Sequence, residues 1–267
     1  MFTANYHTHT KRCGHATGED EEYVQEAIGQ GFSDLGFSDH IMLPGFVEPY
    51  VRGDFSLFED YCSSIRDLSD RYSEQIQIYL GFEAEAFRPY FPFYKELIGN
   101  GVIDYLILGN HSAMDDSHEL ICKFGNITSV SQLYLYRDLA LEAIQSGMFQ
   151  IFAHPEYFMM SIENFDSDCK KVSKSLIEAC MAYDVPLEIN LSGIRMGEKQ
   201  FLSKRRLRYP TDEFFELVGK YGAKCIFGAD AHKPDQLSME SVNYLGVQFA
   251  KKHNLNVIDR LDTIRRH

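Results

Sequence analysis

The feature that most constrains the fold is a sevenfold rhythm, in which a short apolar run ends in a polar cluster and is followed by a longer amphipathic segment. Runs rich in Ile, Leu, Val, Phe and Tyr are typical of strands buried on both faces. They cover residues 2–7, 34–37, 75–82, 105–108, 149–152, 186–189 and 224–227. Helical spacing of apolar residues follows at 19–30, 55–72, 131–146, 168–183, 211–221 and 236–251. This alternation predicts parallel βαβ units.

The polar clusters at the strand ends bear on which parallel architecture is formed. They are His-Thr-His at 7–9, Ser-Asp-His at 38–40, Glu-Ala-Glu at 83–85, Asn-His-Ser at 110–112, His-Pro-Glu at 154–156, Asn190 with Ser192, and Asp-Ala-His at 230–232. An open doubly wound sheet collects functional groups chiefly at one switch point. A barrel collects them from every strand at its C-terminal mouth. The sequence therefore predicts an α/β fold, a distorted (β/α)7 TIM-like barrel with its active site at that mouth.

Length and composition narrow the setting in which such a site would work. The 267 residues contain no low-complexity linker, so a single domain over residues 1–267 is expected. The net charge of −13 disfavours nucleic acid as a partner. No apolar run approaches a membrane span and no signal pattern opens the chain, so we expect a cytoplasmic protein with no membrane partner. The six cysteines form no CxxC pair and are expected to be free thiols.

Histidine placement indicates a metal site. A lone histidine is usually structural, but six of the ten lie within a few residues of a predicted strand end, and a seventh lies in the first loop. These seven are His7, His9, His40, His111, His154, His232 and His15. Imidazole combined with carboxylate, here Glu83 and Asp230, suits zinc, manganese, iron or cobalt. His118, His253 and His267 have no such context and are expected to face solvent. Ligation by the Cys13 thiolate is a less favoured alternative to a loop thiol near the site.

Taken in order, these motifs resemble the PHP superfamily, the polymerase and histidinol phosphatase domain. They are Tyr-His-Thr-His-Thr at 6–10, Cys-Gly-His at 13–15, Ser-Asp-His at 38–40, Gly-Phe-Glu at 81–83, Gly-Asn-His at 109–111, Ala-His-Pro at 153–155 and Gly-Ala-Asp-Ala-His at 228–232. The resemblance runs from residue 6 to residue 232. A free-standing chain of this length with Gly-Phe-Glu looks most like the histidinol-phosphate phosphatase branch.

The resemblance implies a trinuclear centre in a (β/α)7 barrel. Three divalent ions (zinc, manganese or iron, with the identity left open) would be distributed over nine residues. The first ion would take His7, His9, Glu83 and Asp230, the second Glu83, His111 and His154, and the third His15, His40 and His232. Asp39 would orient a neighbouring ligand.

The implied activity is L-histidinol-phosphate phosphatase, a hydrolase of histidine biosynthesis. A metal-bridged hydroxide would attack the small phosphomonoester. Asp230 or His232 would carry the leaving-group proton, and Arg195 would clamp the phosphate. The sequence leaves open whether Arg88, Arg205, Arg206 or Arg208 reach the phosphate. It also leaves open which of Glu85, Asp115, Asp116 and Glu156 meets the amine or imidazole.

Three other functions remain to be distinguished. The first two are a PHP phosphodiesterase or nuclease and a phosphotyrosine-protein phosphatase. The third is a metal-binding module without turnover, which would have a closed coordination shell. The oligomeric state is left open.

Overall fold

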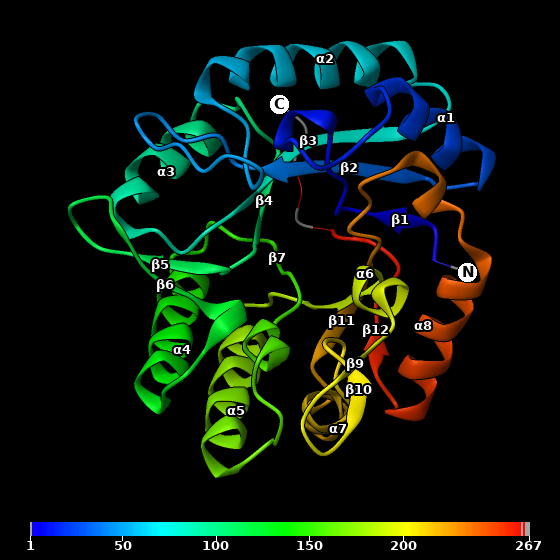
Figure 1. Ribbon diagram of the computed structural model, residues 1–267. Helices are drawn as coiled ribbons and strands as arrows, with labels where there is room; N and C mark the ends of the chain where they lie inside the picture. The colour runs from blue at the N-terminus through cyan, green and yellow to red at the C-terminus, as the bar shows by residue number, and fades with distance from the viewer. Residues whose placement is uncertain (1, 263, 265–267) are drawn as a thin grey trace.

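The computed structural model describes residues 2–262 and residue 264, and among these eight parallel strands form one curved sheet (Figure 1). They are β1 (Ala4–Asn5), β2 (Asp34–His40), β3 (Gln77–Ala84), β4 (Tyr105–Leu108), β7 (Ile151–Phe152), β8 (Leu187–Asn190), β11 (Lys224–Gly228) and β12 (Asn256–Val257), in that order across the sheet. The first seven coincide with the seven predicted runs, although β1 and β7 are shorter. The predicted distorted barrel is confirmed.

Helices lie around the outside of the curved sheet (Figure 1). They are α1 (Asp20–Gly29), α2 (Phe58–Arg71), α3 (Phe91–Gly99), α4 (Val130–Gln145), α5 (Ser167–Ala182), α7 (Asp212–Tyr221) and α8 (Glu240–Lys252). The short helix α6 (Leu191–Met196) follows β8 directly. Sequence signals set several ends: Asp166 caps α5 through its side chain, and Gly222 ends α7 in the left-handed conformation with φ 68°. The last helix begins at Glu240, later than predicted, and α3 was not predicted.

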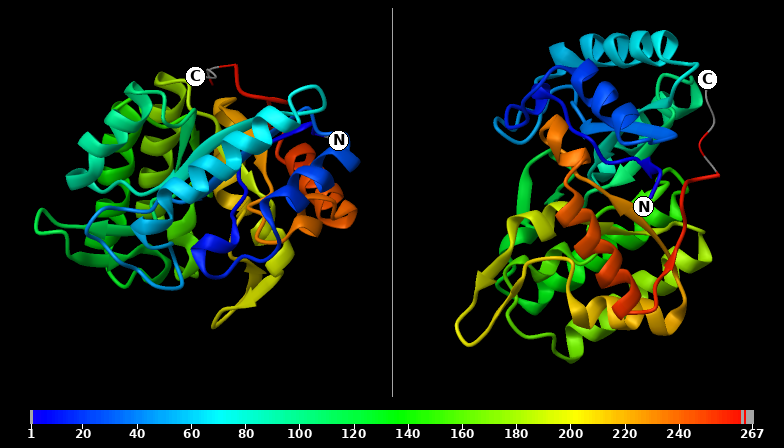
Figure 2. Two further views of the ribbon diagram at one scale, coloured as in Figure 1. Left: turned by 90° about the horizontal axis from the view of Figure 1, so that it is seen from above. Right: turned by 90° about the vertical axis from the view of Figure 1, so that its right-hand side faces the viewer.

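The connections at the mouth carry structure that the sequence pattern did not reveal. Two hairpins pair antiparallel: β5 (Ser112–Met114) with β6 (Leu120–Lys123), and β9 (Glu198–Gln200) with β10 (Arg205–Leu207). Short 3₁₀ turns lie at Lys11–Cys13, Phe55–Leu57, Arg88–Tyr90, Phe124–Asn126, Tyr157–Met160 and Pro234–Leu237. The β9–β10 hairpin projects from the end of the barrel opposite the C-terminal segment (Figure 2).

A narrow seam between the first and last parts of the chain closes the ring. At the mouth, Thr8 pairs with Ala231 in a single parallel bridge. His9 N donates to Ala231 O at 2.9 Å, and Ala231 N donates to His7 O at 3.2 Å. At the start of β11 the neighbouring strand is β12 and not β1. Among the described residues, backbone pairing across the seam is therefore confined to the mouth. This uneven closure is the distortion of the barrel.

The barrel interior is packed below the mouth. Ala4, Tyr6, Tyr105, Ile107, Ile151, Ala153, Ile226 and Leu261 form one buried cluster. The Tyr105 hydroxyl donates to the carbonyls of Tyr6 and Phe37 at 2.8 and 3.1 Å. Leu261 N donates to the Tyr6 hydroxyl at 3.3 Å, so the segment after β12 closes the bottom of the barrel. Among the described residues, the barrel interior is therefore closed at its lower end, and the polar residues lie at the mouth.

Tyr105 occupies this interior only because glycines face it. A Cβ added at Gly81 would lie 2.4 Å from the Tyr105 ring. We expect Gly81→Ala to lower the free energy of unfolding by about 1–3 kcal/mol through overpacking. Urea denaturation measures this, with Gly29→Ala as the control, because nothing lies within 4 Å of a Cβ at that helical glycine. The control should be neutral or stabilise by up to about 1 kcal/mol. Equal stabilities of the two variants would contradict the packing argument.

Two expectations about the chain as a whole can be compared with the structure. All six cysteines are free. None of the described helices combines the length and apolar character needed to cross a lipid bilayer.

Candidate metal centre

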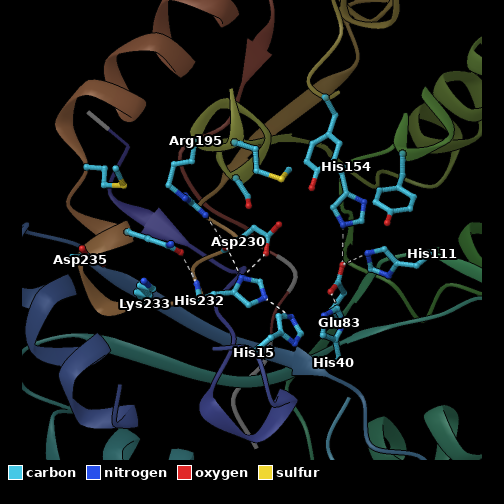
Figure 3. A pocket seen from close by; sticks show the side chains of 16 residues that line it. His15, His40, Glu83, His111, His154, Arg195, Asp230, His232, Lys233 and Asp235 are labelled. Carbon is cyan, nitrogen blue, oxygen red and sulfur yellow. Dashed lines mark hydrogen bonds and ion pairs between the residues drawn. The ribbon is translucent and has the colours of Figure 1, made fainter. Parts of the chain in front are cut away.

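The strand ends bring the predicted ligands together at the mouth (Figure 3). A cavity of about 600 Å³ opens there and is lined by His15, His40, Glu83, His111, His154, Asp230 and His232, with Arg195 on its wall. His7 and His9 complete the set beneath the cavity floor, at 1 % and 0 % exposure. All nine predicted ligands therefore lie in one place, although they come from seven separate segments of the chain.

Glu83 is the centre of this group. It lies one residue before the end of β3, opposite His40 in the β2–β3 register, which sets their side chains side by side. Its Oε1 lies 3.0 Å from His154 Nε2 and 3.5 Å from His111 Nε2. Its Oε2 lies 2.9 Å from His40 Nδ1. One buried carboxylate therefore faces imidazoles on both sides, as a bridging ligand must.

The inner cluster joins β1 to the loop after β11. His7 Nε2 and His9 Nε2 are 3.1 Å apart, which confirms that the two side chains project to the same side of the strand. Asp230 Oδ1 lies 3.2 Å from His9 Nε2 and 3.7 Å from His7 Nε2. The backbone of Asp230 has φ 46°, and that of His154 has φ 29°. Such strained conformations gather at functional sites, where the surrounding structure holds them.

The outer cluster lies nearer solvent. His15 Nε2 and His232 Nε2 are 2.9 Å apart, and the rings of His9 and His232 stack with centroids 4.1 Å apart. Cys13 is buried close by, with its thiol within 4.8 Å of ligand atoms of His15 and His232. Burial raises the pKa of Cys13 to about 12. The structure places Cys13 beside the site, where both a loop thiol and the less favoured ligating thiolate remain compatible with its position.

Three buried carboxylates meet the outward nitrogens of the histidines. Glu188 Oε1 lies 2.6 Å from His7 Nδ1, and Glu85 Oε1 lies 2.8 Å from His111 Nδ1. Asp39 Oδ1 lies 3.5 Å from His9 Nδ1. A carboxylate at the far nitrogen selects the tautomer whose other nitrogen is free to bind a cation. Asp39, predicted to orient a neighbouring ligand, lies beside His9, and its role stays a prediction. The contact of Glu188 with His7 was not predicted, although a lone acid inside an apolar run was a signal.

The electrostatic balance keeps the carboxylates ionised. Burial raises the pKa of Glu83, but His111, His7 and His40 outweigh it and hold that pKa well below its usual range. For Asp230, burial is likewise outweighed by His7 and His9. Burial lowers the pKa of His9, but the nearby carboxylates of Asp230 and Asp39 outweigh it and raise that pKa to about 9.

The donor set fits divalent cations. Facing imidazole nitrogens repel unless a proton or a cation lies between them, and this site has such pairs at 2.9 and 3.1 Å. Within the part of the chain that the structure describes, His154 Nδ1 is buried without a hydrogen-bond partner. Among the described residues, several trios of ligand atoms lie within 4.8 Å of one another, including His7 with His9 and Asp230, and His40 with Glu83 and His111. Buried nitrogen and carboxylate ligands of this kind indicate a metal site.

Comparison with known proteins shows the family to which the chain belongs and agrees with the fold. Residues 5–192 match the PHP domain. The chain belongs to the PHP family. A probable histidinol-phosphatase of Deinococcus radiodurans is 25 % identical over 235 residues, which cover 86 % of each chain. A probable histidinol-phosphatase of Schizosaccharomyces pombe is 28 % identical over 258 residues, covering 87 % of this chain and 81 % of the relative.

A solved structure shares the PHP fold of this chain. It is the histidinol phosphate phosphatase of Lactococcus lactis subsp. lactis Il1403, complexed with zinc, L-histidinol and phosphate. The TM-score is 0.67 at 16 % identity, and the match covers 96 % of this chain and 95 % of that one. The likeness shows that the two chains share the distorted barrel.

The five arginines considered as phosphate ligands lie in different parts of the structure. Arg195 lines the cavity, and its guanidinium donates to the carbonyls of Ala229 and Asp230, both at 2.8 Å. Arg88 is half exposed and pairs with Glu142 at 2.6 Å. The other three candidates lie in or beside the β9–β10 hairpin and do not line the cavity: Arg205, Arg206 and Arg208. Arg206 donates to four backbone carbonyls.

The four acids considered for contact with the amine or imidazole of the substrate differ in their burial. Glu85 and Glu156 are buried: Glu85 meets His111, and Glu156 accepts from Thr211 N at 2.9 Å. Asp115 accepts from Ser117 and Glu119 within the β5–β6 loop, beside the exposed Asp116. None of the four lines the cavity.

The remaining histidines were expected in solvent. His118 is exposed and packs edge-on against Tyr90. His253 contradicts the expectation: its side chain is mostly covered and lies 2.8 Å from Asp212 Oδ1, which it reaches from the end of α8. His267 lies outside the described residues.

Proposed function

We propose that this PHP protein is a metal-dependent phosphatase that hydrolyses L-histidinol phosphate to L-histidinol and inorganic phosphate in histidine biosynthesis. The observation that carries the proposal is Glu83, a buried carboxylate facing imidazoles from several strands at the floor of an open cavity. The relatives named histidinol-phosphatase support the choice of substrate.

Three divalent ions, which we propose to be zinc, manganese or iron, would be held by the nine clustered residues. His7, His9, Glu83 and Asp230 would hold the first, Glu83, His111 and His154 the second, and His15, His40 and His232 the third. The contacts of Glu83 with both His40 and His154 support its place at the centre. When bound, the ions would supply an activated water and neutralise charge on the phosphoryl oxygens.

The protein's own side chains would orient the phosphoester. Arg195 lies at the cavity wall, where its two carbonyl contacts hold the guanidinium in place while its remaining N–H groups are available to a phosphate. Lys233 also lines this wall and adds a second positive charge. The leaving alkoxide needs a proton, and the pair formed by His232 Nδ1 and Asp230 Oδ1, 3.4 Å apart, is our candidate for moving it.

Phosphate release from L-histidinol phosphate tests the proposal. We would assay the metal-loaded protein on this substrate beside bis-p-nitrophenyl phosphate, single-stranded DNA and a phosphotyrosine peptide. A kcat/KM above roughly 10⁴ M⁻¹s⁻¹ for histidinol phosphate alone would support the assignment. Preference for the diester, DNA or the peptide would overturn it in favour of a phosphodiesterase, nuclease or protein phosphatase. Metal binding without turnover of any of them would point to a silent module.

Replacing Arg195 tests the orientation of the phosphate. We expect Arg195→Lys to lower kcat/KM for the phosphomonoester by about 10–100-fold, the effect of losing one charged hydrogen bond of about 1.5–3 kcal/mol. Metal content should be unchanged. Arg88→Gln is the matched control, since Arg88 pairs with Glu142 away from the cavity, and it should leave activity as it was. Activity of Arg195→Lys within about threefold of the parent would remove Arg195 from the site.

A further inference from the structure

Glu188 is a buried acid in an apolar strand. It lies in β8 between Leu187 and Ile189, opposite Ile226 in the register with β11, and is 1 % exposed. Its one ion-pair partner among the described residues is His7, with no lysine or arginine in reach. A buried carboxylate without a cationic side chain is costly unless its oxygens are fully hydrogen-bonded.

Both oxygens of Glu188 are engaged by donors. Oε1 lies 2.6 Å from His7 Nδ1. Oε2 accepts from His154 N at 2.9 Å and from Asn190 Nδ2 at 2.8 Å. One side chain therefore links β8 to the segments that follow β1 and β7, and it does so directly behind two of the clustered histidines.

The space around the carboxylate is shaped for it. A Cβ at Gly228, the β11 residue opposite Asn190, would lie 1.7 Å from Glu188 Oε1. Glycine at this position therefore lets the side chain reach across β11 to His7.

The hydrogen bonds around Glu188 extend through Asn190 to Asp230. Asn190 Nδ2 lies 3.2 Å from Asp230 Oδ2, and Asn190 Oδ1 accepts from the first turn of α6. The pair formed by Glu188 and Asn190 thus contacts residues at both sides of the barrel seam.

We propose that Glu188 is a positioning residue of the metal centre, which fixes the ring of His7 and the strand end at His154 so that their nitrogens face one point. The inference rests on the proposed metal centre and adds to it a residue that touches neither ion nor substrate. With Nδ1–H of His7 donated to Glu188, the lone pair of Nε2 is directed at the cluster.

Only a carboxylate satisfies this position. All three groups around Glu188 are donors: an imidazole N–H, a backbone N–H and an amide NH₂. A glutamine would turn its own NH₂ toward His7 in one orientation and toward both His154 N and Asn190 Nδ2 in the other, so at least one contact becomes repulsive. If that contact is His7, the other tautomer is favoured, and its proton occupies the nitrogen that faces the cluster.

The experiment compares Glu188→Gln with the parent protein, both loaded with zinc. We expect the variant to bind its most weakly held zinc about 10–100-fold less tightly in a chelator competition. Two-bond ¹⁵N–¹H correlation spectra should show the Nδ1–H tautomer of His7 in the parent and a loss of that state in the variant. Gly228→Ala, which displaces the same carboxylate from the opposite strand, should weaken zinc binding in the same direction.

Asp104→Asn is the matched control. Asp104 is also a buried acid beside a barrel strand whose oxygens accept only from donors, Leu80 N and Arg66, and none of its contacts belongs to the cluster. It should lose stability without losing zinc affinity. If Glu188→Gln behaves like this control, with unchanged affinity and tautomer, Glu188 is structural and the inference falls. If the parent binds no metal, the proposed function falls with it, so the two failures are distinguishable.

Discussion

Glu83→Gln should lower kcat/KM for the phosphomonoester by about 10³-fold or more, because a loss of about 4 kcal/mol at the transition state corresponds to that factor. The carboxylate lies 2.9–3.0 Å from His40 and His154, so no other described side chain can take its central place. Glutamine keeps the shape but removes the negative charge that two cations would share. Steady-state kinetics with measured metal content would record both losses.

The control for Glu83 is an acid remote from the cavity. Glu142→Gln breaks the exposed pair with Arg88, and surface pairs of this kind contribute little to stability. It should retain full activity and metal content. A Glu83→Gln protein that keeps its metal and more than a tenth of the parent rate would contradict a bridging role for this residue.

Removal of metal should have the second largest effect. After exhaustive dialysis against a chelator, we expect hydrolysis to fall to background and to return with zinc, manganese or iron. The melting temperature should fall by roughly 10 °C, since ions at 1,000 times their Kd stabilise by about 4 kcal/mol and each kcal/mol shifts the Tm by about 2–4 °C in a chain of this size. The ion-free site holds mutually repelling groups, which adds to the loss.

Calcium separates specific loading from a general effect of cations. The clustered ligands are mostly imidazole nitrogens, whereas calcium prefers six to eight oxygens. Calcium should therefore restore neither activity nor melting temperature. Full hydrolysis by protein shown to be free of metal would exclude a metal-dependent reaction.

The parts of this protein that could be predicted from its sequence are those that depend on local patterns. Apolar runs marked seven strands, and the polar residues after them marked the mouth, because in a parallel barrel all strand ends meet there. His7 and His9 share a side through the two-residue period of a strand. Asp230 could be expected near this pair only because the strands close into a ring. The residues next to Asp230 in the sequence do not indicate it.

Other parts depend on contacts between distant segments. Helix α3 contains Pro92 and a run of aromatic residues, a weak helical pattern. Glu188 stood in a strand that was read for its apolar residues only, and its partner His7 is 181 residues away in sequence. His253 is covered because α8 brings it against Asp212, which spacing along one helix cannot reveal.

The seam of the barrel has a consequence for synthesis of the chain. His7 and His9 emerge from the ribosome before Asp230 and His232, with which they cluster, and more than 200 residues separate the two pairs in the sequence. The single bridge from Thr8 to Ala231 can form only after both have left the exit tunnel. A nascent chain therefore lacks a complete cluster until Asp230 and His232 have left the tunnel. Until then the early histidines are without the carboxylate beside which they lie in the folded protein, so we expect the proposed ion site to form only when the ring closes.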